Sequence, residues 1–137
     1  MLTVNELAIQ ANAPAHVVRY YTRIGLIEPA AQRENGYRLF SPGNASRLRF
    51  IRMCKQLGFT LKEIREITLH AEHGKSPCEE VRRIIQEHIE ENRTRIDEMR
   101  ILQTRMEYAL AQWESMPNGM PDGNSVCHLI ESIDLES

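Results

Sequence analysis

The sequence lacks several features that would each assign it to a familiar class of protein. It contains no apolar run close to the roughly 20 residues that a membrane-spanning helix needs. Its first ten residues, MLTVNELAIQ, lack the basic stretch followed by an apolar stretch that forms a signal peptide. A nucleophile–base set and a phosphate-cradling glycine loop are missing as well. We therefore expect a cytoplasmic protein that is not an enzyme and does not contact a membrane.

Cysteine is scarce, because the 137 residues include only Cys54, Cys78 and Cys127. Three dispersed cysteines are too few for a disulfide framework, and an odd number fits buried thiols, metal ligands or a redox sensor. Cys54 lies on the apolar side of a predicted helix, so we interpret it as a buried core residue. Cys78 and Cys127 are the candidates for metal binding or redox chemistry.

The charged residues are divided unevenly along the chain. The net charge of the whole sequence is −2, which by itself argues weakly against nucleic-acid binding. Residues 1–60, however, carry eight Lys/Arg and three Asp/Glu, whereas residues 61–137 carry nine and sixteen. A basic first part followed by an acidic second part predicts a nucleic-acid-binding module joined to a region with another task.

Two short helices around a tight turn are predicted at the start of the chain. Residues 3–11 have apolar side chains at helical spacing, and Thr3 with Glu6 forms a capping box. The second helix covers about residues 14–24 and closes at Gly25, a suitable residue for a helix C-terminus. The arrangement is that of a helix-turn-helix.

A small β-hairpin and two more helices are predicted next. Asn35-Gly36 favours a two-residue hairpin turn, so the segments around Arg33 and Arg38 form the strands of a wing. A third helix covers about residues 42–56, and a fourth, capped by Thr60, covers about residues 61–71.

Residues 78–114 contain neither glycine nor proline and predict one long helix. Its apolar stripe has a near-heptad interval and consists of Ile85, Ile89, Asn92, Ile96, Met99, Met106, Leu110 and Trp113. Such a helix is too one-sided to stand alone, so it predicts a coiled coil with a second copy of the chain. The alternative is a long packing helix within a monomer, but only about 75 residues precede it to cover the stripe. After it, a Pro/Gly/Asn-rich loop leads to a short terminal helix that carries Cys127 and His128.

The first forty residues resemble the MerR-family DNA-binding domain nearly throughout. The R-Y-Y…G-L-I segment, the R-x-N-G-Y-R wing and the continuation RFIRMCKQLGFTLKEI have the order and spacing of that family. With the long helix and the Cys-bearing loop, the resemblance covers essentially the whole chain. It implies a mainly α-helical fold with three parts. Residues 1–75 form the winged helix-turn-helix domain with its coupling helices, residues 76–115 form a dimerisation helix in an antiparallel coiled coil, and residues 116–137 form an effector loop and terminal helix.

The resemblance also implies a function and its partners. A homodimer binds double-stranded operator DNA, each helix-turn-helix reads a major-groove half-site, and the wings grip the flanking backbone. Such regulators occupy promoters with an overlong spacer between the two elements that RNA polymerase recognises. When an effector binds, they bend and untwist the spacer, which uses the deformability of DNA as a switch to activate transcription.

Seven residues are predicted to contact DNA, and they lie in the basic first part: His16, Arg19, Tyr20, Arg33, Tyr37, Arg38 and Arg52. By the resemblance, Arg19 and Tyr20 contact the backbone, while Arg33, Tyr37 and Arg38 serve the wing. His16 either reads a base or is solvated. Tyr21 is either a core residue or a DNA contact. Arg52, like Lys55, faces the DNA or the partner's long helix.

The resemblance places Cys78 and Cys127 in a metal-sensing site. Cys78 opens the long helix, where a helix N-terminus favours the thiolate. In the metal-sensing branch, sensors of zinc, cadmium, lead or mercury have a cysteine at this position, whereas sensors of copper, silver and gold have a serine. An antiparallel helix pair carries the loop with Cys127 toward Cys78 of the other subunit. We therefore expect a divalent metal ion, with zinc favoured over cadmium, lead and mercury.

The chain departs from that branch at the end of the long helix. The cysteine that the sensors carry there is replaced by Trp113 and Glu114. Two thiolates and His128 still make a three-coordinate site, or a four-coordinate one with Asp122 or water.

Other interpretations remain open at this point. Cys78 and Cys127 could instead respond to oxidants or electrophiles, without a metal. A multidrug-type regulator would bind an organic ligand, but the tail is too small to enclose one. The remaining histidines are interpreted as surface or interface residues, and these are His70, His73 and His88.

Overall fold

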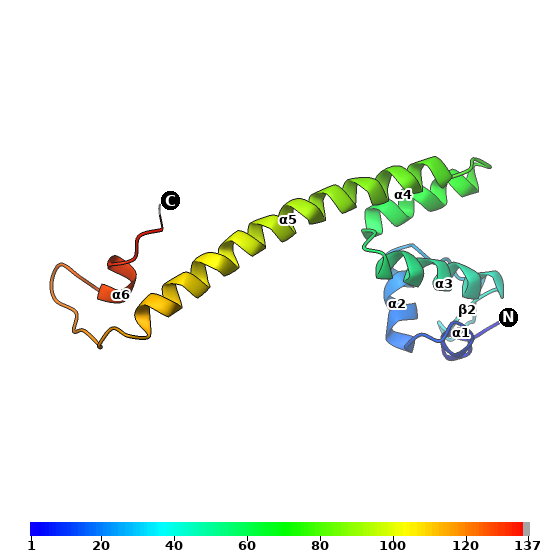
Figure 1. Cartoon of the computed structure of the whole chain (residues 1–137). Coiled ribbons are helices and arrows are strands. Elements are labelled where there is room, and N and C mark those ends of the chain that lie inside the picture. Colours follow the sequence, from blue (N-terminus) through cyan, green and yellow to red (C-terminus); the bar gives the residue numbers. More distant parts are fainter. Residues whose placement is uncertain (136–137) are drawn as a thin grey trace. The chain divides into compact units, whose positions relative to one another are not determined.

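The computed structural model describes residues 1–135, and it divides into one compact unit, Met1–Gln86, and a second that begins at Glu87. Each unit is described by itself. Both are built mainly of helices, and the only sheet among the described residues has two short strands (Figure 1). Within residues 1–135, no helix combines the length and the apolar character that crossing a membrane requires. The prediction of a mainly α-helical fold is confirmed.

The first unit begins with the predicted helix-turn-helix. Helix α1 covers Val4–Gln10, and the Thr3 hydroxyl and the Glu6 carboxylate form the predicted capping box. Helix α2 covers Ala15–Arg23 and is followed by Gly25, whose φ of +85° lies in the left-handed region that glycine adopts at little cost.

The wing is a hairpin of two two-residue strands. Strand β1 (Ala31–Gln32) pairs antiparallel with β2 (Arg38–Leu39), with Gln32 opposite Arg38. The hairpin contains Asn35-Gly36, but the predicted two-residue turn is wrong, because residues 33–37 separate the two strands. The Gly36 amide donates to the Arg33 carbonyl at 2.9 Å, so the turn already begins at Arg33, and of the two predicted turn residues only Gly36 has a positive φ, of +87°. A β-bridge between Leu2 and Phe40 fixes the hairpin to the start of the chain.

Two further helices complete the first unit. Helix α3 covers Gly43–Gln56, and α4 covers Leu61–Glu72 with the predicted capping box of Thr60 and Glu63. The core that joins all these elements is formed by fully buried side chains, among them Leu7, Val18, Phe40, Leu48, Ile51 and Ile64. Each such side chain contributes about 1.5–3 kcal/mol by leaving water.

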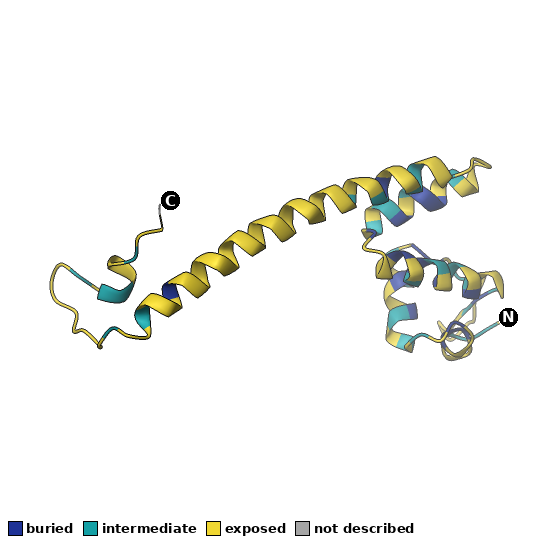
Figure 2. Cartoon of the chain, viewed as in Figure 1, coloured by how far each residue is buried: buried dark blue, intermediate teal, exposed yellow. Residues whose placement is uncertain are grey.

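Helix α5 covers Cys78–Trp113, in agreement with the predicted long helix. Ile84 near its start is buried in the core of the first unit. From residue 89 to the end of the helix, most side chains are exposed, and Ala109 is a buried exception (Figure 2). The chain ends, as far as it is described, with the short helix α6 (His128–Glu131).

Candidate functional site

Helix α2 has one buried and one exposed face. Val18 and Tyr21 are buried in the core. The sequence left open whether Tyr21 is a core residue or a DNA contact, and its burial makes it a core residue. His16, Arg19 and Tyr20 lie on the exposed face. The face therefore presents a polar, partly cationic surface next to the wing.

A concave surface collects most of the arginines predicted to contact DNA. A cavity of about 360 Å³ is lined by the beginning of α1, by α2 and by the wing, through Thr3, Val4, Asn5, Arg19, Arg33, Tyr37 and Arg38. We call this set the basic cavity. Three arginines that line one cavity suit an anionic sugar-phosphate backbone, because a guanidinium group can form two parallel hydrogen bonds to phosphate oxygens.

The wing tip is held by its own hydrogen bonds. The backbone amide of Arg33 donates to the Tyr37 carbonyl at 2.7 Å, and the Asn35 side chain accepts from the Tyr37 amide at 3.1 Å. Gln32 Nε2 donates to the Gly36 carbonyl at 3.2 Å. The Tyr37 side chain is nevertheless 68% exposed. The backbone of the wing is thus ordered, while its aromatic and cationic side chains are free to reach a partner.

Arg52 is half-buried on α3, and its guanidinium donates to the backbone carbonyl of Asn12, in the turn between α1 and α2. Its neighbour Arg49 donates to the Gln10 carbonyl at 3.2 Å. Sequence reasoning missed these contacts. A signal was present, because Pro14 has no amide hydrogen to satisfy the Gln10 carbonyl. That Arg52 contacts DNA stays a prediction.

The three cysteines have different environments. Cys54 is 6% exposed in the core of the first unit, and burial raises the pKa of its thiol. It therefore fits the predicted structural role. Cys78 is exposed at the first residue of α5, and its amide donates to Ser76 Oγ at 3.4 Å. Cys127 is half-buried at the N-cap of α6.

The segment that carries Cys127 and His128 is fixed by several hydrogen bonds. Glu131 Oε1 accepts from the Val126 amide at 2.8 Å and from the Cys127 amide at 2.6 Å. His128 Nε2 lies 2.9 Å from the Pro117 carbonyl oxygen. Trp113 Nε1 donates to the Leu129 carbonyl at 2.7 Å. The segment therefore has a defined conformation at the end of α5.

The loop before this segment is also ordered. Asp122 Oδ1 accepts hydrogen bonds from the amides of Asn124 and Ser125, at 2.7 and 2.9 Å. These bonds hold the pKa of the Asp122 carboxyl below its usual range. Gly119 packs so closely on His128 that an added Cβ would lie 2.4 Å from His128 Cδ2. A larger residue at 119 would displace the imidazole.

The predicted metal ligands are divided between the two units of the chain. Across residues 1–135, no group of three or more His, Cys, Asp and Glu side chains could hold a metal ion. Cys78 belongs to the first unit, whereas Cys127 and His128 belong to the second. A metal site made of these three residues stays a prediction.

Two family models match the chain. One is described as "MerR HTH family regulatory protein" and matches residues 2–70. The other is described as "MerR, DNA binding" and matches residues 45–109. Together they cover α1 to α4, the wing and most of α5.

Individual relatives agree with these models. The chain is 31% identical over 137 residues to the HTH-type transcriptional regulator ZntR of Escherichia coli K12, with 98% of this chain and 93% of that protein covered. It is 29% identical to the transcription regulator PbrR691 from Ralstonia metallidurans CH34, solved in complex with lead(II), with a TM-score of 0.76 and coverage of 96% and 98%. It is 25% identical to EcmrR in an EcmrR–DNA complex, with a TM-score of 0.60 and coverage of 82% of this chain and 39% of that one.

Proposed function

This chain belongs to the MerR family of DNA-binding transcription regulators, and from that membership we propose that it activates transcription in response to a divalent metal ion. In this proposal, two copies bind promoter DNA, and the metal is held by Cys78, Cys127 and His128. The carrying observation is that two cysteines outside the core stand at the first residue of α5 and at the N-cap of α6.

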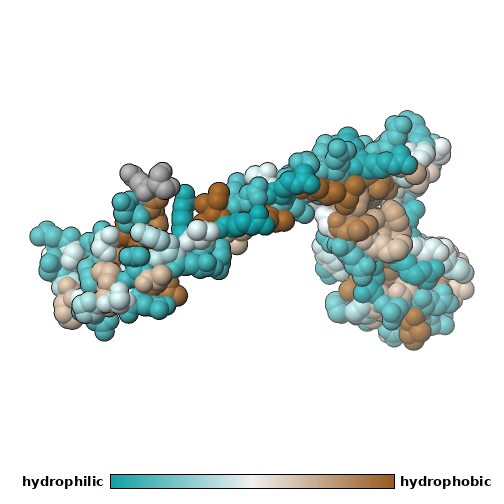
Figure 3. Space-filling model, in the orientation of Figure 1, coloured by the Kyte–Doolittle hydropathy of each residue, from teal (hydrophilic) through white to brown (hydrophobic). Residues whose placement is uncertain are grey.

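The exposed stripe of α5 supports the proposed homodimer. Apolar surface is visible along the long helix in Figure 3. Five apolar side chains at heptad positions are about half exposed or more, and these are Ile89, Ile96, Met99, Met106 and Leu110. A helix of 36 residues is ~54 Å long at 1.5 Å per residue, so the stripe is a long apolar surface that remains exposed among residues 1–135. Burying it in an antiparallel coiled coil removes that surface from water, which is the main driving force for such pairing.

The basic cavity supports contact with the DNA backbone. Arg19 of α2 and Arg33 and Arg38 of the wing line one hollow, so a single stretch of sugar-phosphate backbone can contact all three. The exposed face of α2, with His16 and Tyr20, then enters the major groove. Tyr37 at the wing reaches the flanking minor groove or backbone. Two such units, one from each copy, hold a pair of half-sites.

The chemistry of the donor set fits a zinc-like ion. Two thiolates and one imidazole are ligands that divalent zinc accepts, and zinc completes its shell with water or a carboxylate. Residues 1–135 bring no three such donors together, and in this proposal a second copy supplies the missing ligand. The similarity to PbrR691, which was solved in complex with lead(II), supports a divalent metal for this chain as well.

Hydrogen bonds in the segment with Cys127 and His128 compensate, in this proposal, for the absence of a third cysteine. Trp113 stands where the metal-sensing branch carries a third cysteine, and its indole instead fixes Leu129. Glu131 fixes Cys127 through two amide hydrogen bonds. The chain therefore holds Cys127 and His128 by hydrogen bonds, and a bound metal would supply positive charge and a link between subunits at that point.

Activation follows from linking subunit geometry to DNA shape. Cys78 begins α5, and α5 continues from a buried start at Ile84 in the core of the DNA-binding unit. A change at Cys78 is thus transmitted through a packed helix to the helix-turn-helix. We propose that this change bends and untwists an overlong promoter spacer, so that RNA polymerase contacts both of its elements.

Metal titration of the full-length reduced protein tests the proposal. Native mass spectrometry with zinc, cadmium, lead and mercury ions should show stoichiometric binding of at least one of them. Cys78→Ser and Cys127→Ser should each abolish it. Cys54→Ala is the matched control, since Cys54 is buried in the core, and it should bind metal as the unaltered chain does.

Two outcomes contradict the metal site. Binding that survives both serine substitutions removes Cys78 and Cys127 from the ligand set. Reversible Cys78–Cys127 disulfide formation that alters DNA binding, in a protein that binds none of the four ions, would favour the thiol-based regulator instead.

A further inference from the structure

Three arginines of α3 and α4 contact the helix-turn-helix through its main-chain carbonyl groups. Arg49 donates to the Gln10 carbonyl at 3.2 Å, Arg52 donates to the Asn12 carbonyl, and Arg65 Nη2 donates to the Ile24 carbonyl at 2.7 Å. Each bond spans about 40 residues of sequence. The cationic side chains therefore connect α3 and α4 to the α1–α2 pair.

Two of these carbonyl groups, those of Gln10 and Ile24, lie at helix C-termini, where no amide of the same helix donates to them. Gln10 is the last residue of α1, and the residue four positions later is Pro14, which has no amide hydrogen. Ile24 is the C-cap of α2. Carbonyl groups at a helix C-terminus carry the negative end of the helix dipole, so a guanidinium group is a favourable donor there.

Arg52 acts on the turn that sets the angle between α1 and α2. Asn12 in this turn has a φ of +53°, in the left-handed region where a residue with a side chain is uncommon. The hydrogen bond from Arg52 holds the peptide group directly after this residue. The turn is thus fixed from α3, two residues before the N-cap of α2 at Pro14.

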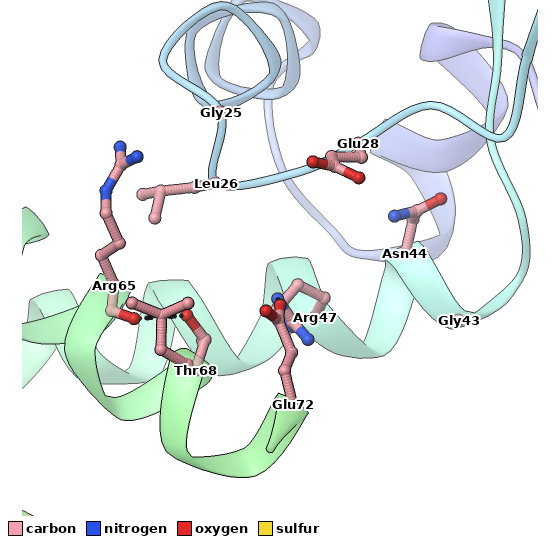
Figure 4. Close-up of a pocket in the computed structure, with 10 residues that line it drawn as sticks. Gly25, Leu26, Glu28, Gly43, Asn44, Arg47, Arg65, Thr68 and Glu72 are labelled. Carbon is pink, nitrogen blue, oxygen red and sulfur yellow. Dashed lines mark hydrogen bonds and ion pairs between the residues drawn. The ribbon is translucent and has the colours of Figure 1, made fainter.

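Arg65 acts on the other end of α2. Figure 4 shows its side chain extending from α4 toward the chain at Gly25, along one wall of a cavity of about 520 Å³. On the same cavity wall, Arg47 of α3 forms an ion pair with Glu72 of α4 at 3.5 Å. The pair is one contact between α3 and α4, the helix from which Arg65 extends.

We propose that Arg52 and Arg65 are positioning residues for sequence recognition. They hold α2 at both ends and so fix the angle at which His16, Arg19 and Tyr20 meet the bases. The inference rests on the DNA-binding part of the proposed function and is independent of the metal. Base readout needs groups placed to within about 0.5 Å, whereas attraction to phosphate does not depend on such precise placement. Loosening α2 should therefore lower the affinity for selected DNA more than the affinity for unselected DNA.

The test compares selected with unselected DNA. The full-length protein selects a duplex from a library with a randomised central segment, and an unselected duplex of equal length serves as the reference. Affinities of Arg52→Gln and Arg65→Gln for both duplexes are measured over a range of salt concentrations. Arg82→Gln is the matched control, because Arg82 is an exposed arginine of α5 outside these contacts.

In each variant the ratio of the two affinities should fall about tenfold, which is the loss of affinity that one mismatched base pair causes. The salt dependence should stay as in the unaltered chain, because this inference gives Arg52 a backbone carbonyl as its partner in place of the DNA contact predicted from the sequence. Arg52→Lys keeps the charge and one donor, so it should recover part of the ratio. Arg82→Gln should leave the ratio unchanged.

Three results overturn the inference. If both affinities fall equally and the salt slope decreases by about one, the arginine contacts phosphate. If the ratio is unchanged in both variants, neither residue positions α2. If the unaltered chain enriches no sequence, the reading of DNA by α2 is itself wrong, a failure separate from any failure to bind metal.

Unfolding of a variant does not block the test. Thermal unfolding of each protein is recorded first, and binding is measured well below the transition. Since the affinity ratio compares two duplexes on the same folded protein, a lower stability by itself leaves the ratio unaltered. Arg65→Gln provides a second, independent position should Arg52→Gln not fold.

Discussion

The indole nitrogen of Trp113, the last residue of α5, donates a hydrogen bond of 2.7 Å to the carbonyl oxygen of Leu129 in α6. The donor is half-buried, and the two residues are 16 positions apart. This bond closes the loop between α5 and α6, so that the segment with Cys127 and His128 is attached to the end of α5.

Replacing the indole should loosen that segment. Trp113→Phe keeps an aromatic ring and removes the donor, at a cost of about 1 kcal/mol for one hydrogen bond. Amide hydrogens of residues 126–131 should exchange faster in hydrogen-exchange mass spectrometry. Tyr108→Phe, on the exposed surface of α5, is the control. Equal exchange in Trp113→Phe and the unaltered chain would show that other contacts hold the segment.

A charge in the stripe of α5 should prevent pairing. Ile96→Glu places a carboxylate on the surface that we propose the second copy buries, so the dimer should dissociate. Sedimentation velocity measures the oligomeric state. Thr94→Glu adds the same charge about 200° away around the helix and should leave the state unchanged. A dimer that persists in Ile96→Glu would mean that the stripe is not the interface.

Loss of one arginine of the basic cavity should weaken DNA binding in a salt-dependent way. Arg19→Ala should lower affinity and reduce the slope of log affinity against log salt by about one, because one phosphate contact is lost. Fluorescence anisotropy with a labelled duplex measures both quantities. A slope equal to that of the unaltered chain would remove Arg19 from the backbone contacts.

The capping box of α1 should make stability depend on pH. The backbone amide and the side chain of Thr3 lower the pKa of the Glu6 carboxyl in the folded protein. A lowered pKa stabilises the fold above the ordinary pKa, and that contribution is lost as pH falls through the folded value. Glu6→Gln should therefore lower the melting temperature at neutral pH, and the difference should shrink in acid. A difference that is constant with pH would contradict this account.

The cap of α4 offers a simpler test of local structure. Thr60 accepts the Glu63 amide at 3.2 Å, and its own amide donates to the Glu63 carboxylate at 2.8 Å. Thr60→Ala should destabilise the first unit by about 1 kcal/mol, measured by urea unfolding. Thr104→Ala, on an exposed part of α5, should have little effect. Similar stabilities for both variants would mean that the cap contributes nothing measurable.

Much of the fold could be predicted because its signals are local. Thr3 with Glu6 and Thr60 with Glu63 mark helix starts, and Asn35-Gly36 marks a hairpin, through bonds between residues at most a few positions apart. The uninterrupted run from Cys78 likewise predicted a long helix. The core role of Cys54 followed from its place on an apolar helix face.

The sequence by itself therefore determined the helix-turn-helix, the wing, the long helix and the family, because periodicity, caps and turn residues act over short distances. Only the tertiary structure decided that Tyr21 is buried, that Arg52 and Arg65 bind backbone carbonyls about 40 residues away, and that Trp113 holds Leu129. Long polar side chains have many rotamers, and the sequence carries no local signal for their distant partners. Those contacts form only once packing of the apolar core has brought the backbone groups within reach.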